Sequence, residues 1–81
     1  MNNNIKDFEI FGITGYTVMS TYHLRDSNLS LKAKGLLSIM LSLPKEWDYS
    51  INGLTVISGE GRASIKSILN ELKSAKYVKL T

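Results

Sequence analysis

The side chains best suited to bind an anionic partner are concentrated in the last third of this 81-residue chain. Residues 53–81 carry five basic side chains and only two acidic ones, whereas residues 1–52 carry five of each. The net charge of +3 therefore arises entirely from the last third. Lysine and arginine neutralise phosphate groups, so a local basic excess is compatible with a polyanionic partner. Charge alone slightly favours a simpler interpretation, the solvated face of an ordinary helix.

The sequence gives little indication of catalysis, nucleotide binding or metal binding. The serine, histidine and aspartate nearest to one another, Ser20, His23 and Asp26, lack the glycine-flanked elbow of a catalytic serine. We interpret His23 as a solvated or capping side chain. The Gly59-Glu60-Gly61 run lacks the third glycine and the preceding strand of a dinucleotide-binding loop. The chain has no cysteine, which excludes thiolate nucleophiles, thiolate metal ligands and disulfides. We expect no enzyme, no metal site, no cofactor and no small-molecule substrate.

The basic side chains of the last third need a helix to position them. Apolar residues recur there at the helical spacing i, i+3, i+4 and i+7, which predicts an amphipathic helix from Arg62 to about Ala75. Its inner face consists of Ile65, Ile68, Leu69 and Leu72. Its outer face is then Arg62, Ala63, Lys66, Ser67 and Asn70.

A short helix precedes this long one. Ser50 is a candidate N-cap for residues 51–58, with Ile51, Leu54 and Ile57 facing inward and Val56 as a further inward candidate. Gly59-Glu60-Gly61 then predicts a turn, since glycine allows positive φ at low cost. A short helix, a glycine-containing turn and a longer amphipathic helix are typical of a helix-turn-helix, whose second helix enters the major groove of DNA.

The outer face of the long helix has side chains that suit this role. Arg62 can contact guanine or phosphate, and Asn70 can pair with adenine. Ser64, Lys66 and Ser67 can bond to phosphates or bases, and Lys73, Lys76 and Lys79 can support them. Glu60 counts mildly against this interpretation because it would lie near phosphates. Any surface helix also has a polar outer face.

The remaining elements complete a small domain. Ser30 is a candidate N-cap for a helix over residues 31–43 that ends before Pro44, although no capping-box acid stands at Ala33. Gly35, unfavourable inside a helix, is explained if another backbone approaches closely there. Strands are expected from Tyr16 and over residues 77–80. Trp47 and Tyr49 are expected to cap the core.

The fold class that follows is mainly α, with a three-helix core and a small antiparallel β element. The strand after the long helix suggests a winged helix-turn-helix with an incomplete wing. We expect residues 1–15 to form an N-terminal arm and residues 16–81 to form the domain, as a fragment of a longer protein. No run of apolar residues has the length of a membrane span, and no secretory signal is apparent, so we expect a cytoplasmic protein.

Three runs of the sequence, residues 29–38, 41–44 and 47–50, resemble a known family. They are similar to the N-terminal winged-helix domains of phage and plasmid replication initiators and DnaD-like replisome organisers of Gram-positive bacteria. The resemblance covers about residues 16–80 and implies a DNA-binding domain acting in replication or on a mobile element. Where the family usually has glycine before an aromatic and an aliphatic residue, this chain has Lys76 before Tyr77 and Val78. Lysine is unfavourable in a left-handed helix cap, so we expect a differently shaped helix end and wing angle.

The expected partner is double-stranded DNA, with self-association or binding to replication proteins as further possibilities. The alternative is an interaction or oligomerisation module that does not contact DNA. It predicts an exposed apolar patch that includes Phe8, Phe11 and Tyr16. The two hypotheses differ in salt dependence, because phosphate contacts weaken as salt rises and apolar contacts do not.

Overall fold

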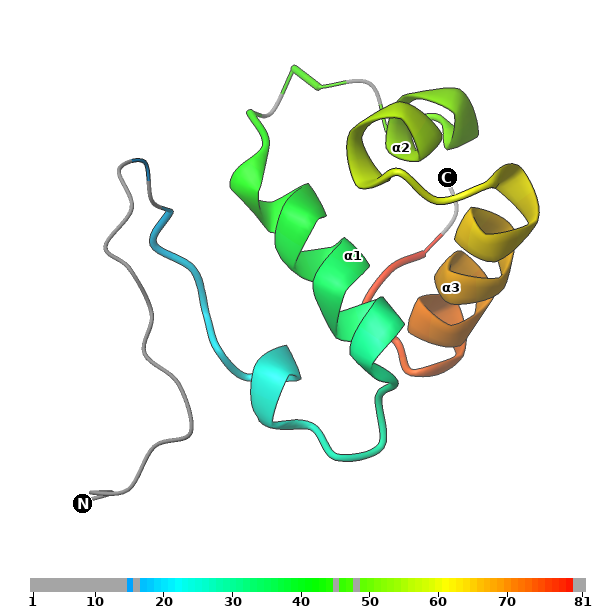
Figure 1. Cartoon of the computed structure of the whole chain (residues 1–81). Helices are drawn as coiled ribbons and strands as arrows, with labels where there is room; N and C mark the ends of the chain where they lie inside the picture. Colours follow the sequence, from blue (N-terminus) through cyan, green and yellow to red (C-terminus); the bar gives the residue numbers. More distant parts are fainter. Residues whose placement is uncertain (1–14, 16, 45, 48, 80–81) are drawn as a thin grey trace, which may run out of the picture.

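The computed structural model describes residues 15, 17–44, 46–47 and 49–79. The described chain contains a short 3-10 helix η1 (His23–Arg25) and three α-helices, α1 (Leu31–Ser42), α2 (Ile51–Ser58) and α3 (Arg62–Ser74). Figure 1 shows α1 crossing the middle of the molecule, with α2 and α3 grouped beyond it. The predicted helices are therefore confirmed, and their ends agree with the sequence pattern to within one residue.

Both predicted N-caps are confirmed. The hydroxyl of Ser30 accepts a hydrogen bond from the amide of Ala33, at 3.1 Å, at the start of α1. The hydroxyl of Ser50 accepts one from the amide of Gly53, at 3.0 Å, at the start of α2. At the other end of α1, Leu43 adopts an extended conformation before Pro44, as the restricted backbone ahead of proline requires.

The core forms where α3 packs against both α1 and α2. Ile65, Ile68 and Leu72 of α3 are buried as predicted, and Leu69 is half-buried. The other buried apolar residues are Leu29, Ala33, Leu36, Leu37 and Leu54. The predictions that Ile57 and Val56 face inward are wrong, since both are exposed and Leu54 is the one buried residue of α2.

The predicted strands are not formed in the described part of the chain. Val18 is 91% exposed, and the amide of Tyr77 donates to Leu72 in the helix cap rather than to a neighbouring strand. A strand without a partner leaves its amide and carbonyl groups unpaired, so neither segment gains from a β conformation alone. Tyr16 and Leu80 lie outside the described residues. The confirmed fold is a small all-helical arrangement, and the expected antiparallel β element is absent from the described residues.

The end of α3 keeps the shape that glycine usually provides. Lys76 has a φ of 68°, in the left-handed region. Its amide donates to the carbonyl of Lys73, and the amide of Tyr77 donates to the carbonyl of Leu72, at 3.0 and 2.9 Å. This pair of bonds is a Schellman motif. The expectation of a differently shaped helix end is wrong: lysine adopts the left-handed conformation, which costs about 1–2 kcal/mol for a residue with a Cβ atom.

His23 is buried, which corrects its interpretation as a solvated side chain. It is 2% exposed, and its Nε2 atom lies 2.8 Å from the hydroxyl of Ser38 on α1. That hydroxyl donates its only proton to the carbonyl of Lys34, so Nε2 must donate to the serine oxygen. His23 therefore anchors η1 to α1.

Candidate nucleic-acid interface

The outer face of α3 is exposed over its whole length. The side chains there are those of Arg62, Ala63, Lys66, Ser67, Asn70 and Lys73, and each of these residues is exposed. The opposite face of α3 is buried against α1 and α2, which prevents the helix from turning these side chains inward. The arrangement presents three cations, a hydroxyl and an amide on one rigid surface.

Arg62 begins α3 and is held against the preceding helix. Its Nη1 atom donates a hydrogen bond to the side-chain oxygen of Asn52 on α2, and both side chains are exposed. Asn52 was not among the predicted site residues. Nothing in the local pattern indicates the pairing, because the two residues lie ten positions apart on different helices. Asn52 thereby orients the guanidinium at the turn between α2 and α3.

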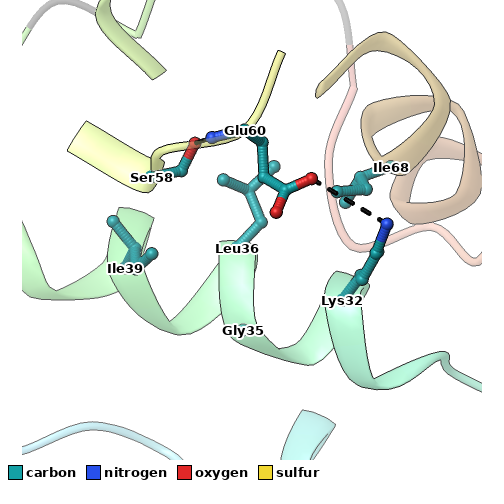
Figure 2. Close-up of a pocket in the computed structure, with 7 residues that line it drawn as sticks. All are labelled: Lys32, Gly35, Leu36, Ile39, Ser58, Glu60 and Ile68. Carbon is teal, nitrogen blue, oxygen red and sulfur yellow. Dashed lines mark hydrogen bonds and ion pairs between the residues drawn. The ribbon is translucent and has the colours of Figure 1, made fainter. Parts of the chain in front are cut away.

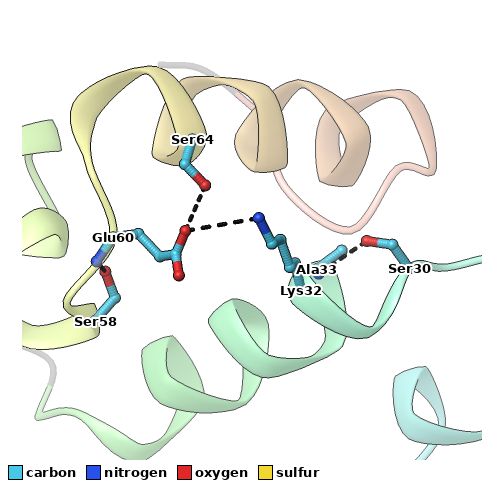
Figure 3. Close-up of polar contacts among 6 residues, drawn as sticks. All are labelled: Ser30, Lys32, Ala33, Ser58, Glu60 and Ser64. Carbon is cyan, nitrogen blue, oxygen red and sulfur yellow. Dashed lines mark hydrogen bonds and ion pairs between the residues drawn. The ribbon is translucent and has the colours of Figure 1, made fainter.

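Ser64 lies apart from the exposed group. It is half-buried, and its hydroxyl donates to Glu60 at 2.6 Å. Figure 3 shows the side chains of Ser64, Glu60 and Lys32 pointing toward one another in the space between α1 and α3. Lys32 lies 3.9 Å from the same carboxylate oxygen, which makes a long and mostly exposed ion pair of small expected strength.

A small hollow lies beside this ion pair, on the inner side of α3. Its volume is about 180 Å³, and Figure 2 shows the lining residues, Lys32, Gly35, Leu36, Ile39, Ser58, Glu60 and Ile68. A Cβ atom added to Gly35 would meet nothing within 4 Å. The expectation that another backbone approaches Gly35 is therefore wrong: the space above it is open.

Both acidic side chains of the last third are engaged away from the outer face of α3. Glu60 accepts from Ser64, as described above. Glu71 accepts hydrogen bonds from the amide and hydroxyl of Ser30, each at 2.7 Å. These bonds, the backbone one first, hold the pKa of Glu71 below its ordinary value of 4.5. The concern that Glu60 would lie among the phosphate contacts is weakened by this geometry.

The last three predicted basic residues meet at the C-terminal end of α3. Lys73, Lys76 and Lys79, together with Tyr77 and Val78, line a surface hollow of about 430 Å³. The hydroxyl of Tyr77 donates to Asp26 at 2.8 Å. The loss of solvent around the phenol and this bond to Asp26 raise the pKa of Tyr77 to about 12. Tyr77 is neutral at physiological pH, as a tyrosine of ordinary pKa also is, and adds no negative charge to the hollow.

Other expectations concern different parts of the chain. Phe8, Phe11 and Tyr16, the expected apolar patch, lie outside the described residues. Within the described ranges, no three histidine, aspartate or glutamate side chains gather as a metal site would require. None of the described helices is long and apolar enough to cross a membrane.

Comparison with models of protein families, with curated proteins and with solved structures found no match.

Proposed function

We propose that this protein binds double-stranded DNA through a helix-turn-helix formed by α2, the turn at Gly59–Gly61 and α3. The observation that carries the proposal is the two-sided character of α3. One side is buried against α1 and α2, and the other exposes basic and amide side chains. An α-helix with its side chains is about 10–12 Å across, and the major groove is about 12 Å wide, so the exposed side of α3 can enter it.

The proposed contacts divide between the two kinds of DNA group. Asn70 suits adenine, because its amide presents a donor and an acceptor together. Lys66, Ser67 and Lys73 suit phosphate oxygens, which position a protein on the duplex without reading its sequence. Arg62 suits either guanine or phosphate, and its bond to Asn52 would orient the guanidinium before DNA arrives.

The winged-helix form and a role in replication or on a mobile element belong to the same proposal. Their support is the resemblance of residues 29–38, 41–44 and 47–50 to replication initiators and replisome organisers. In this version the wing would begin after Lys76. Residues 77–80 would need a partner strand to form this wing. Within the described part of that segment, residues 77–79, no strand is formed.

The test is a titration of a fluorescent duplex of mixed sequence at two salt concentrations, followed by anisotropy. The affinity of the wild-type chain should fall steeply with salt, with a slope of about 0.9 per phosphate contact on a log–log plot. Replacing both Arg62 and Lys66 with alanine should weaken binding by at least about tenfold and reduce the slope by about 1 to 2. Arg25→Ala removes an exposed cation of η1, outside α3, and serves as the charge control.

Two outcomes would contradict the proposal. One is a double variant that binds the duplex as tightly as the parent chain. The other is a wild-type chain that has no salt-dependent affinity for the duplex, which the alternative function of a protein-interaction module predicts. That alternative has the exposure of Val56, 84%, and Ile57, 39%, on α2 in its favour. Sedimentation of the protein alone at the same two salt concentrations would then reveal self-association.

A further inference from the structure

Lys76 has a backbone conformation that favours glycine, although a lysine cation near the C-terminal end of a helix also interacts favourably with its free carbonyl groups. Among the described residues it is the one non-glycine residue with a positive φ. The two bonds that close α3 there join backbone groups, so glycine would make both without the strain of a Cβ atom. Residues held in such a strained backbone conformation are concentrated at functional sites, so a functional role for the Lys76 side chain is expected.

Lys76 lies beside a surface hollow with other basic residues. The hollow at this end of α3 is lined by three lysines and two largely apolar residues, Tyr77 and Val78. Within the described part of the chain, none of the three lysines forms an ion pair with a carboxylate. The carboxylates bonded to this region, Asp26 and Glu71, accept hydrogen bonds from Tyr77 and Ser30. All three lysines are exposed residues.

The C-terminal end of a helix is otherwise a poor place for an anion, because its free carbonyl groups carry partial negative charge. Here the amides of Lys76 and Tyr77 satisfy two of these carbonyls. The three lysine cations still exceed the two carboxylates near this end, Asp26 and Glu71, together with the remaining half charge of the helix end. The balance at this end of α3 is positive.

We propose that this hollow binds one phosphate of the DNA backbone, with Lys76 as a direct contact. This proposal rests on the proposed function and adds to it a contact beyond the outer face of α3. A phosphate held at the C-terminal end of α3 fixes how the helix lies along the groove, while Asn70 contacts a base. Lysine at position 76 then contributes to binding at a cost in backbone strain.

The experiment measures stability and DNA affinity on the same variant. Lys76→Gly relieves the strain and should raise the Tm by about 4–8 °C in a domain of this size. The same substitution should weaken duplex binding about five- to tenfold at about 0.1 M salt and reduce the salt slope by about 0.9, the loss of one phosphate contact. Lys76→Ala keeps the strain and removes the charge, so its affinity should fall equally without the gain in Tm.

The outcomes separate this proposal from the function on which it depends. If Lys76→Gly binds with the parental affinity and salt slope while Lys66→Ala is weakened, the phosphate contact is overturned and the proposed function stands. If the wild-type chain has no salt-dependent affinity for the duplex, both are overturned. An unchanged Tm in Lys76→Gly would overturn the claim that lysine at this position carries a cost in backbone strain.

Discussion

The carboxylate of Glu71 in α3 takes both hydrogen-bond donors of Ser30 at the start of α1. Its Oε2 atom accepts from the backbone amide and its Oε1 atom from the hydroxyl, both at 2.7 Å. In a capping box the acid that accepts from the N-cap amide stands three residues later in the same helix. Position 33 is alanine here, and Glu71, 41 positions away on another helix, accepts the hydrogen bond from the Ser30 amide instead. The start of α1 is thereby joined to the inner side of α3.

This relationship predicts that Ser30 and Glu71 are energetically coupled. Ser30→Ala should destabilise the protein by about 1 kcal/mol or more, since it removes an N-cap. Glu71→Gln should also be destabilising, and the double variant should lose less than the sum of the single losses, because both substitutions remove the same bond. Chemical denaturation gives the three values. Ser42→Ala is the matched control, as its hydroxyl bonds only locally, to Ile39, and additivity with Glu71→Gln is expected. Additivity in the Ser30 pair would disprove the coupling.

The same contact predicts a dependence of stability on acid pH. The folded pKa of Glu71 lies below its ordinary value of 4.5, so the carboxylate stabilises the fold above that pH. This contribution is lost as pH falls through the lower, folded pKa. Glu71→Gln should therefore show a shallower decline of Tm below about pH 4.5 than the parent chain. Thermal melts across this range measure it, and identical acid limbs would argue against the contact.

Tyr77 predicts a dependence at the alkaline end. Burial and the bond to Asp26 raise its pKa from 10.0 to about 12, which means that the protonated phenol stabilises the fold. The contribution is complete below pH 10 and is lost as pH rises toward 12. Tyr77→Phe should flatten this alkaline limb, whereas Tyr22→Phe, the partner in the ring pair, should leave it in place. Phenolate absorbance measured during the titration gives an independent reading, and an unshifted transition for Tyr77 would be inconsistent with the bond.

Two glycines should respond to alanine in opposite directions. Gly35 lies inside α1 with open space where a Cβ atom would stand, so Gly35→Ala should stabilise the protein by about 1 kcal/mol. Gly59 ends α2 with a φ of 77°, and Gly59→Ala should destabilise it by about 1–2 kcal/mol. Urea denaturation of both variants is sufficient. A loss of stability in Gly35→Ala would mean that the added Cβ atom meets neighbouring atoms, which contradicts the open space beside this glycine.

Asn70 and Lys66 should affect DNA binding differently if α3 is the recognition helix. Lys66→Ala should weaken binding to all duplexes alike and reduce the salt slope by about 1. Asn70→Ala should leave the salt slope unchanged and relax the preference for the base it contacts, by about 1–3 kcal/mol. Selection of binding sites from a random duplex pool, repeated with each variant, distinguishes the two effects. If both variants weakened binding to every sequence equally, α3 would contact only the phosphate backbone of the DNA and no bases.

The helices themselves were predictable from the sequence because their signals are local. Ser30 and Ser50 cap the helices that follow them, Pro44 excludes a helical Leu43, and the spacing of Ile65 to Leu72 defines which side of α3 is buried. The same spacing determined which polar side chains of α3 are exposed. These features depend on residues within a few positions of one another, so the linear order contains the information.

Only the tertiary structure decided which polar groups meet. The contacts of Glu71 with Ser30, of Tyr77 with Asp26 and of His23 with Ser38 span 41, 51 and 15 positions. Helical periodicity does not indicate such pairs, and the sequence alone led to the interpretation of His23 as a solvated or capping side chain. The prediction of strands was wrong for the same reason, since a β conformation depends on a neighbouring strand and not only on the residues of one segment. Local propensity defined the helices and the exposed side of α3, and long-range contacts defined which polar side chains pair with one another.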